Sequence, residues 1–400
     1  ITYFSNYNST LNFFFLHDIN NYLILDSFSI LLAAIPIFSY LIFYLPLSIN
    51  TDNNFSKLLI TFSIISAVIC CLINSLFLFW IAYEISILCL LFAILINSPY
   101  SERLFSLWYF LGYIFLGGIP LITIVLYFFL KNYNFYFNEI TMEYGASSFI
   151  WLILFISFIS KVPLVPFHGW LPFVHAEAST FISIMLSGYI MKFGIIGIYR
   201  FNLIPNISVN YYITFIVLFS LFLFINSIIE IDLKRWLAFL SLGHINISVL
   251  GLASLSESSI NVSSLFCLSH GLSAGLLFFF FFIYSTTTSS RNWVSLLSYN
   301  KNIIWLIILT MSLLGLSSFP PSLGFITEIN VILNSAFFSS FLLICLFIYM
   351  FISALIPVIL LSLACGRGGA FVSTYINLSS IYICVILLIL LFLWGVISIL

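Results

Sequence analysis

The fold is decided by the stretch KVPLVPFHGWLPFVHAEA, residues 161–178, which interrupts an otherwise apolar part of the chain. A cation inside a bilayer costs roughly 2.5–3.5 kcal/mol on insertion scales. A proline removes a backbone donor, which hydrocarbon tolerates only where protein or water covers the gap. Lys161 stands beside two prolines and is followed by further ionisable groups at His168, His175 and Glu177. This pattern indicates a hydrated, ion-handling centre inside a membrane bundle.

The composition supports a membrane protein. Of the 400 residues, 63% are hydrophobic and only 6% are charged, and the mean hydropathy of +1.24 lies far above that of soluble domains. A net charge of −1 gives no reason to expect nucleic acid as a partner. The seven cysteines form no CxxC pair, so neither an iron–sulfur cluster nor a metal site is predicted.

Apolar runs predict an all-α polytopic membrane protein with about twelve transmembrane helices, because each run can cross a hydrocarbon core about 30 Å thick. Residues 1–22 are expected to form a short N-terminal segment, and residues 23–400 a single helical bundle. The predicted spans are 23–49, 57–76, 77–97, 104–130, 148–171, 179–201, 208–230, 236–253, 261–284, 302–333, 337–364 and 379–399.

Basic residues predict the orientation of the spans. The connections after odd-numbered spans contain seven of them, namely Lys57, Arg103, Lys234, Arg235, Arg291, Lys301 and Arg367. The connections after even-numbered spans contain only Lys131 and Arg200. By the positive-inside rule, the first set faces the matrix or cytoplasm.

Two spans combine prolines with a charge, and they occupy matching places in the chain. The fifth span contains Lys161, and the tenth contains Pro320, Pro321 and Glu328. Each is the fourth member of a group of five spans, spans 2–6 and spans 7–11. Because five is odd, the second group enters the membrane from the opposite side and is inverted relative to the first. We therefore expect inverted five-helix repeats at about 57–201 and 208–364, each with a proline-broken helix on the ion pathway.

Six ionisable side chains inside the spans point to proton transfer: Glu84, Lys161, Lys192, His244, His270 and Glu328. Any one of them has an alternative interpretation as a structural ion pair, but a purely structural bundle does not need polar groups in six helices. A Glu–Lys pair 4 Å apart is worth about 4 kcal/mol at an effective dielectric near 20. Separating Glu84 from Lys161 would therefore favour proton release, and the histidines suit a relay.

Two other patterns have simpler interpretations. His168 and His175 are seven residues apart, but Gly169 and Pro172 interrupt the helix between them, which disfavours haem or metal ligation. Lys234 and Arg235 lie at a predicted helix start, where anchoring is the default role and participation in a proton pathway the alternative.

Several motifs resemble one family, the antiporter-like proton-pumping subunits of NADH–ubiquinone oxidoreductase, respiratory complex I. They are KVPLVPFHGWLPFVHAEA (161–178), DLKRWLAFLSLGH (232–244) and LSHGLSAGLLFFF (268–280). Among the three antiporter-like subunits, the segments HAEA (175–178) and SERLFSLWYF (101–110), together with Glu328, resemble chain 4. The sodium/proton antiporters of the multicomponent type share the Lys161 motif and are the alternative.

The resemblance implies roles for the six residues. Glu84 would pair with Lys161, Lys192 and His244 would form the central hydrophilic axis, His270 would continue it, and Glu328 would be the terminal protonatable site. It also implies that flavin, iron–sulfur clusters and ubiquinone bind to other subunits and that no cofactor binds here. The expected partners are neighbouring membrane-arm subunits and lipid, in the mitochondrial inner membrane, with the chain encoded by the organelle.

The sequence departs from the family in three places. The family usually has fourteen spans, and the residues before Asp26 are too few and too polar to supply the first two. Ser179 stands where proline is usual, which affects the start of the sixth span. Thr327 replaces a customary glycine before Glu328, which affects the local helix geometry.

Overall fold

The computed structural model describes residues 23–44, 54–98, 101–132, 136–137, 148–206, 210–254, 257–288, 290–293, 303–335, 339–366 and 378–397. The predicted N-terminal segment 1–22, Lys301 and Arg367 lie outside these ranges. Within them the chain forms helices and isolated bridges, without a β-strand.

The helices of the first part of the chain follow the predicted spans closely. In chain order they are α1 (Ser27–Phe38), the π-helix η3 (Ser39–Tyr44), α3 (Asn54–Leu72), α4 (Leu76–Asn97), α5 (Arg103–Asn132), α6 (Ser148–Lys161), α7 (Trp170–Glu177), α8 (Thr180–Met185), the π-helix η6 (Leu186–Ile190), α9 (Met191–Arg200) and α10 (Leu203–Asn206).

The second part continues in the same way, with α11 (Asn210–Ile229), α12 (Leu233–Ala253), α13 (Glu257–Thr288), α15 (Ile303–Leu316), α16 (Leu323–Ser335), α17 (Ser340–Gly366) and α18 (Leu378–Ile397). Each predicted span thus coincides with a helix or with consecutive helices. Eight segments in the described residues are long and apolar enough to cross a bilayer alone. The predicted all-α polytopic fold is confirmed.

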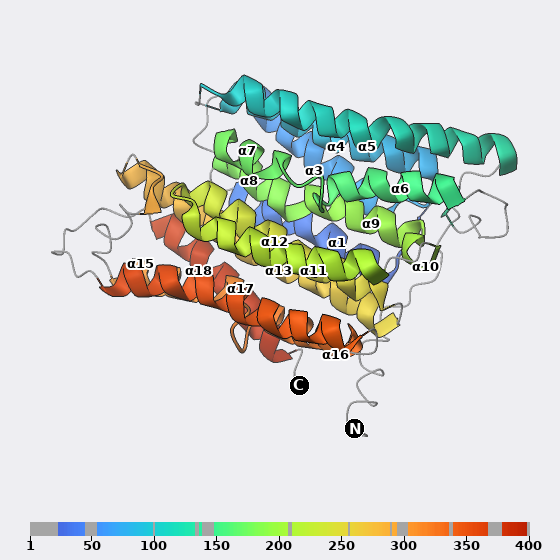
Figure 1. The fold of residues 1–400 in the computed structure, drawn as a ribbon. Helices are drawn as coiled ribbons and strands as arrows, with labels where there is room; N and C mark the ends of the chain where they lie inside the picture. Colours follow the sequence, from blue (N-terminus) through green and yellow to red (C-terminus); the bar gives the residue numbers. More distant parts are fainter. Residues whose placement is uncertain are drawn as a thin grey trace.

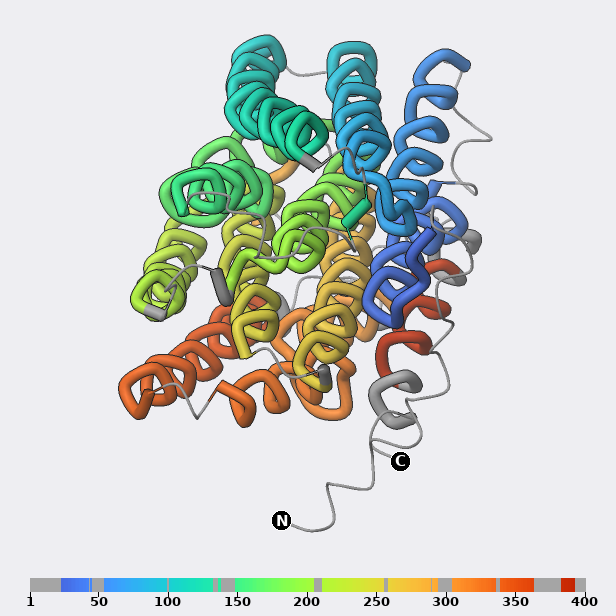
Figure 2. Tube along the Cα trace, turned by 90° about the vertical axis from the view of Figure 1, so that its right-hand side faces the viewer, coloured from blue at the N-terminus to red at the C-terminus, as the bar shows by residue number. Residues whose placement is uncertain are grey.

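Three of these eight segments form the centre of the bundle. In the segments Thr180–Arg200, Leu233–Ala253 and Ser258–Thr288, 89–94% of the most apolar window is buried, against 39–50% in the other five. The long helices lie side by side (Figure 1). Seen roughly along them, α3, α4 and α5 cover one side of the centre, and α15 to α18 cover the opposite side (Figure 2). Polar side chains on the central helices are therefore shielded from lipid.

The packing order of the first group of helices recurs in the second. The pairs α3–α4, α4–α5, α5–α6, α5–α7 and α6–α9 are in contact. The corresponding pairs α11–α12, α12–α13, α13–α15, α13–α16 and α15–α17 are in contact as well. Each group therefore has a broken helix that packs in the same way on its neighbours. The repeat boundaries at 57–201 and 208–364 stay a prediction.

The first break separates α6 from α7. The helix α6 ends at Lys161, earlier than the predicted residue 171, because Pro163 and Pro166 follow at once. The indole Nε1 of Trp170 donates to the carbonyl of Ser160 at 3.2 Å, which covers one of the acceptors left free at the end of α6.

The second break separates α15 from α16. Ser318 adopts a positive φ of 52° between the two helices. The hydroxyl of Ser322 then accepts a hydrogen bond from the backbone N–H of Phe325 at 3.4 Å and caps α16. Each break also contains a cis peptide bond, before Pro166 and before Pro321.

Candidate functional site: a buried series of ionisable side chains

The structure places the predicted ionisable residues inside the bundle. The exposed fraction is at most 4% for five of them, Lys161, Lys192, His244, His270 and Glu328. Glu84, on α4, is half-buried. The five buried side chains do not face lipid, where an unpaired charge would be unstable. They form two groups with different geometry.

The first group consists of Glu84 and Lys161, which converge on a pair of glycines in α5. Gly117 lies against the Cε atom of Lys161, and Gly118 lies against the Oε1 atom of Glu84. A side chain at either glycine would occupy the space that the two ionisable groups use. The glycine pair therefore brings α4 and α6 close to the middle of α5.

Within this group the amine and the carboxylate are not directly paired. Lys161 Nζ donates to the backbone carbonyl of Ile114 at 3.1 Å and lies 5.0 Å from the centre of the Tyr83 ring. Glu84 Oε1 has no hydrogen-bond partner among the described residues. The close pair implied by the family resemblance is therefore open in this structure, although both groups lie at the same glycines.

The second group begins at Lys192. Its ammonium donates to the carbonyl of Ser187, within the π-helix η6, and lies 3.4 Å from His270 Nδ1. The wider turn of a π-helix occurs often at functional sites. Lys192 therefore links the central segment α8–α9 to α13.

The second group continues through two histidines to a carboxylate. The rings of His270 and His244 have centroids 6.0 Å apart. His244 Nδ1 lies 2.8 Å from the hydroxyl of Tyr349 and 3.5 Å from Glu328 Oε1. Lys192, His270, His244 and Glu328 thus follow one another across α9, α13, α12 and α16, and among the described residues neither imidazole Nε2 has a hydrogen-bond partner.

Aromatic side chains stand between the two groups. The rings of Tyr83 and Phe193 are 5.7 Å apart, and those of Phe193 and Tyr189 are also 5.7 Å apart. The Tyr189 hydroxyl is hydrogen-bonded to Ser63 at 2.9 Å. Lys161 touches this aromatic set through Tyr83, whereas Lys192 directly precedes Phe193.

The arrangement provides groups that can move a proton. Amines, imidazoles and carboxylates accept and release protons, and the second group places them in contact. No three His, Cys, Asp or Glu side chains in the described ranges gather in a way that could hold a metal ion.

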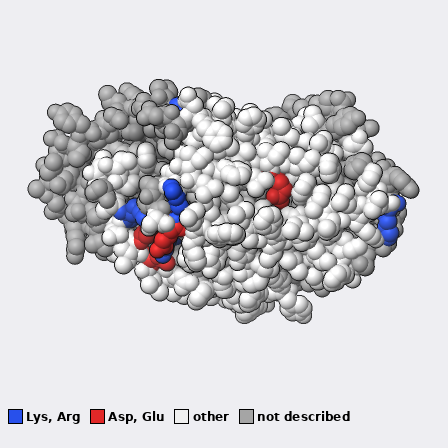
Figure 3. Space-filling model, turned by 90° about the horizontal axis from the view of Figure 1, so that it is seen from above, with Lys and Arg blue, Asp and Glu red and all other residues white. Residues whose placement is uncertain are grey.

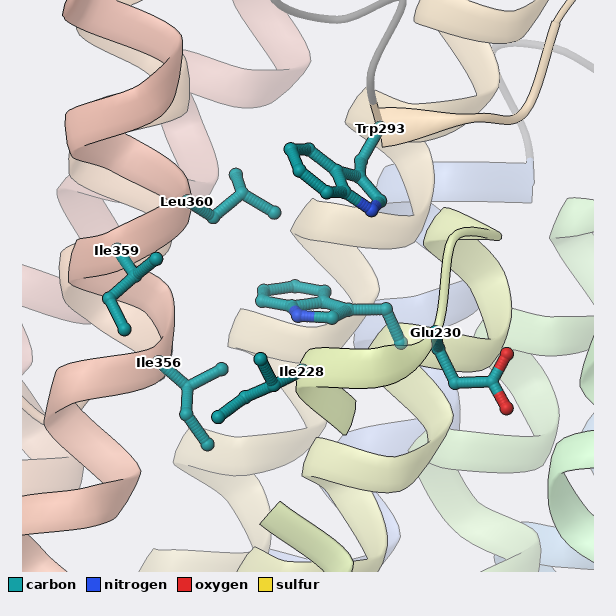
Figure 4. A pocket seen from close by; sticks show the side chains of 7 residues that line it. Ile228, Glu230, Trp293, Ile356, Ile359 and Leu360 are labelled. Carbon is teal, nitrogen blue, oxygen red and sulfur yellow. The ribbon is translucent and has the colours of Figure 1, made fainter. Parts of the chain in front are cut away.

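An apolar pocket of about 90 Å³ lies away from this series, at the edge of the bundle where α11 and α12 approach α17. Figure 4 shows that the Glu230 carboxylate points away from it. Its lining residues are Ile228, Glu230, Trp236, Trp293, Ile356, Ile359 and Leu360. This lining offers no chain of proton-bearing groups.

Charged residues of both signs gather near one end of the face shown in Figure 3, which is otherwise mostly uncharged apart from an acidic patch near its middle and a basic patch at the opposite end. Arg291 donates to the Ala176 carbonyl at 2.7 Å, and Lys234 donates to the Ala178 carbonyl at 2.8 Å. We call the following residues the end cluster: Glu102, Glu177, Asp232, Lys234, Arg235 and Arg291. The predicted anchoring by Lys234 is thus a bond that fastens the start of α12 to the end of α7.

Sequence reasoning missed Tyr349 and the glycine pair. Tyr349 is fully buried on α17, but nothing near it in the sequence marks it as a partner of His244. The pair Gly117–Gly118 in an apolar helix was a usable indication, because small residues let helices approach closely in membranes.

Comparison with known proteins finds relatives of this chain. A chain named NADH-ubiquinone oxidoreductase chain 4 from Chondrus crispus is 34% identical over 201 residues, covering 47% of this chain and 39% of the relative. The matched region therefore spans about two fifths of that relative's length.

Solved structures share the fold. A chain of respiratory complex I from Thermus thermophilus matches with a TM-score of 0.81 and 19% identity, covering 93% of this chain and 81% of that one. A chain of the Mrp complex from Dietzia matches with a TM-score of 0.74 and 16% identity, covering 88% and 68%.

The family model described as NADH:quinone oxidoreductase/Mrp antiporter, transmembrane, matches residues 73–356. This range contains both broken helices and all six predicted ionisable residues of the two groups. Because the match covers well over half of the 400 residues, the chain belongs to the transmembrane family of NADH:quinone oxidoreductases and Mrp antiporters.

Proposed function

We propose that this chain is a proton-translocating membrane-arm subunit of NADH:ubiquinone oxidoreductase, of the chain 4 type. The observation that carries the proposal is the series Lys192, His270, His244 and Glu328 in the centre of the bundle. Burying four ionisable groups costs stability, since well-packed apolar residues are often as stable or more so, and a function would explain why these groups are present.

The geometry at His244 supports a switching step. When Nδ1 is unprotonated, it accepts from the Tyr349 hydroxyl at 2.8 Å. When the ring becomes protonated, Nδ1–H donates instead, and Glu328 Oε1 at 3.5 Å is the acceptor with opposite charge. In the tautomer that accepts from Tyr349, Nε2 already carries a proton, so a proton from His270 would bind at Nδ1, turn His244 from Tyr349 toward Glu328, and pass from Nδ1 to the carboxylate.

The first group supports a gate. Lys161 is held by the Ile114 carbonyl, and Glu84 Oε1 is unpaired. Closing the two into an ion pair would hold the proton on the lysine, and opening them would favour its release. The structure has the open arrangement.

The remaining features of the proposal follow from the chain 4 resemblance. Neighbouring antiporter-like subunits would be its partners, and flavin, iron–sulfur clusters and ubiquinone would bind in other subunits. The energy for pumping would therefore come from redox chemistry outside this chain. The location would be the mitochondrial inner membrane, as for a chain encoded by the organelle.

The test is replacement of the gate residues in the assembled complex. Lys161→Ala and Glu84→Gln should lower proton pumping and coupled NADH oxidation by about tenfold or more, which corresponds to about 1.4 kcal/mol or more in the barrier. The matched control is Lys131→Ala, since Lys131 is exposed in the last turn of α5. Normal pumping by both assembled gate variants would refute the proposal.

A subunit of a multicomponent sodium/proton antiporter is the second candidate, favoured by the fold shared with the Mrp complex. The two candidates differ in their partners. A native gel with mass spectrometry of the co-migrating chains distinguishes them: iron–sulfur subunits support the first candidate, and antiporter subunits alone support the second.

A further inference from the structure

The end of α7 is held by two cations from distant parts of the chain. The last carbonyls of a helix have no partner within it, and cationic side chains bind there favourably. Arg291 Nη1 donates to the Ala176 carbonyl at 2.7 Å, and Lys234 Nζ donates to the Ala178 carbonyl at 2.8 Å. Lys234 and both alanines are buried. The two cations therefore cap the end of α7.

The two capping residues are also joined to each other. Arg291 Nη1 lies 3.7 Å from Asp232 Oδ2, and the Asp232 side chain accepts from the backbone N–H of Lys234 at 3.0 Å. In the backbone, the N–H of Leu233 donates to the Arg291 carbonyl at 3.1 Å, and a bridge pairs Asp232 with Asn292. These contacts bind the start of α12 to the segment after α13. We call Asp232, Lys234 and Arg291 the clasp.

The clasp lies where the chain passes from the first group of ionisable residues to the second. The helix α7 follows the first break, and from Ala178 the chain continues through α8 and η6 to Lys192. The clasp residues themselves belong to α12, which carries His244, and to the segment after α13, which carries His270. In addition, α7 packs on both α5 and α12. The first broken helix is thus fastened to the helices of the second group.

We propose that Lys234 and Arg291 are positioning residues that couple the two groups by fastening the end of α7 to α12 and α13. This inference rests on the proposed proton-pumping function. When the gate at Lys161 opens or closes, α7 shifts, and the clasp passes this shift to the helices that hold His244 and His270. Hydrogen bonds from charged donors are stronger than neutral ones, so the end of α7 moves together with α12 and not past it.

The proton-to-electron ratio of the assembled complex in liposomes separates coupling from anchoring. A clasp that only anchored α7 would change the amount of assembled complex and leave the ratio of the assembled fraction unaltered. Lys234→Met and Arg291→Met remove the capping donors and keep an apolar stem. Each should lower the ratio by as much as Lys192→Met does. Adding Lys192→Met to Arg291→Met should bring no further loss, because the same step is already blocked.

Two further variants make the test specific to the caps. Arg291→Lys keeps the charge but replaces the planar fork with a single ammonium, so it should lose only part of the ratio that Arg291→Met loses. The matched control is Arg235→Met, next to Lys234. The Arg235 guanidinium lies 5.8 Å from the centre of the Phe173 ring and so contacts α7 at a side chain. This control should keep the ratio of the unaltered complex.

An unaltered ratio in assembled Lys234→Met or Arg291→Met would overturn the inference, and so would an equal loss in Arg235→Met. If neither methionine variant assembles, Arg291→Lys decides: a lowered ratio supports the inference, and an unaltered one overturns it. An unaltered Arg291→Met beside a lowered Lys192→Met would refute this inference alone. Unaltered ratios in both would instead refute the pumping function on which it rests.

Discussion

The two broken helices share an architecture but differ in their chemistry. In the first, the ionisable residue is Lys161, the last residue before the break, and a backbone carbonyl on α5 holds it. In the second, it is Glu328, which lies beyond the break within α16 and contacts His244. In both groups a carboxylate Oε1 lacks a hydrogen-bond partner among the described residues, but Glu328 Oε1 lies 3.5 Å from His244 Nδ1, whereas Glu84 has no ion pair with Lys161 there. The two groups therefore share a charged residue near a break, but they differ in the side of the break on which it lies and in its sign.

Because of this difference, we expect the two groups to tolerate conservative substitutions unequally. The largest loss of pumping is expected in the first group, at Lys161. Lys161→Arg keeps the positive charge, but a guanidinium does not release its proton in proteins. We expect it to lower proton pumping by about tenfold or more, as Lys161→Ala does, because release is what the gate requires. Pumping assays in liposomes would measure this. A Lys161→Arg variant with normal pumping would mean that the charge alone matters.

Glu328 should tolerate a conservative change better. Glu328→Asp keeps a carboxylate opposite His244 and lengthens a contact that is already 3.5 Å, so we expect a loss of about threefold, or about 0.65 kcal/mol. Glu328→Gln should lose about tenfold or more because the proton acceptor is gone. Equal activities for the Asp and Gln variants would contradict the role of Glu328 as a proton site.

Substitution in the glycine pair Gly117–Gly118 tests how the first group is packed, with a smaller expected effect. An alanine Cβ at Gly117 would meet Lys161 Cε and Ser160 Oγ, and it would lie 3.0 Å from the Ser157 carbonyl. Overpacking of this kind costs about 1–3 kcal/mol, so we expect a lower thermal midpoint and a several-fold loss of pumping.

The control for this test is Gly112→Ala in the same helix. Its Cβ meets nothing within 4 Å, so it reports the change in helix propensity alone. Equal thermal midpoints for the Gly117 and Gly112 variants would show that α5 does not pack closely on Lys161.

The smallest effect is expected at Tyr349. Tyr349→Phe removes the hydroxyl that is hydrogen-bonded to His244 Nδ1, and a buried hydrogen bond is worth about 0.5–1.5 kcal/mol. We expect pumping to fall by about threefold. Tyr211→Phe, at a side chain that is 88% exposed, should pump normally. A Tyr349→Phe variant as active as this control would remove the tyrosine from the switching step.

Much of this organisation could be predicted from the sequence, because the bilayer imposes simple rules. Apolar length located the spans, and proline beside charge located both breaks. The scarcity of charge in the spans singled out the six ionisable residues. Contacts between distant helices could not be predicted, since the bond from Lys161 to the Ile114 carbonyl depends on how α5 and α6 pack.

His175 shows the same limit in another form. Sequence reasoning disfavoured haem or metal ligation by His168 and His175, because Gly169 and Pro172 interrupt the helix between them. In the structure Pro172 lies in the first turn of a new helix, α7, where its missing N–H needs no partner. The helix therefore continues through His175 and turns the ring into the bundle. The rule that proline interrupts a helix was correct. The new helix α7 begins at Trp170, before Pro172, so the chain is still helical at His175.

The most direct test of the central claim is the proton-to-electron ratio of Lys192→Met in liposomes containing the assembled complex. Methionine keeps the length and apolar stem of Lys192 but removes the amine that contacts His270 and the Ser187 carbonyl. If protons cross through the buried series, the ratio should fall below that of the unaltered complex. An assembled variant with an unchanged ratio would contradict the account.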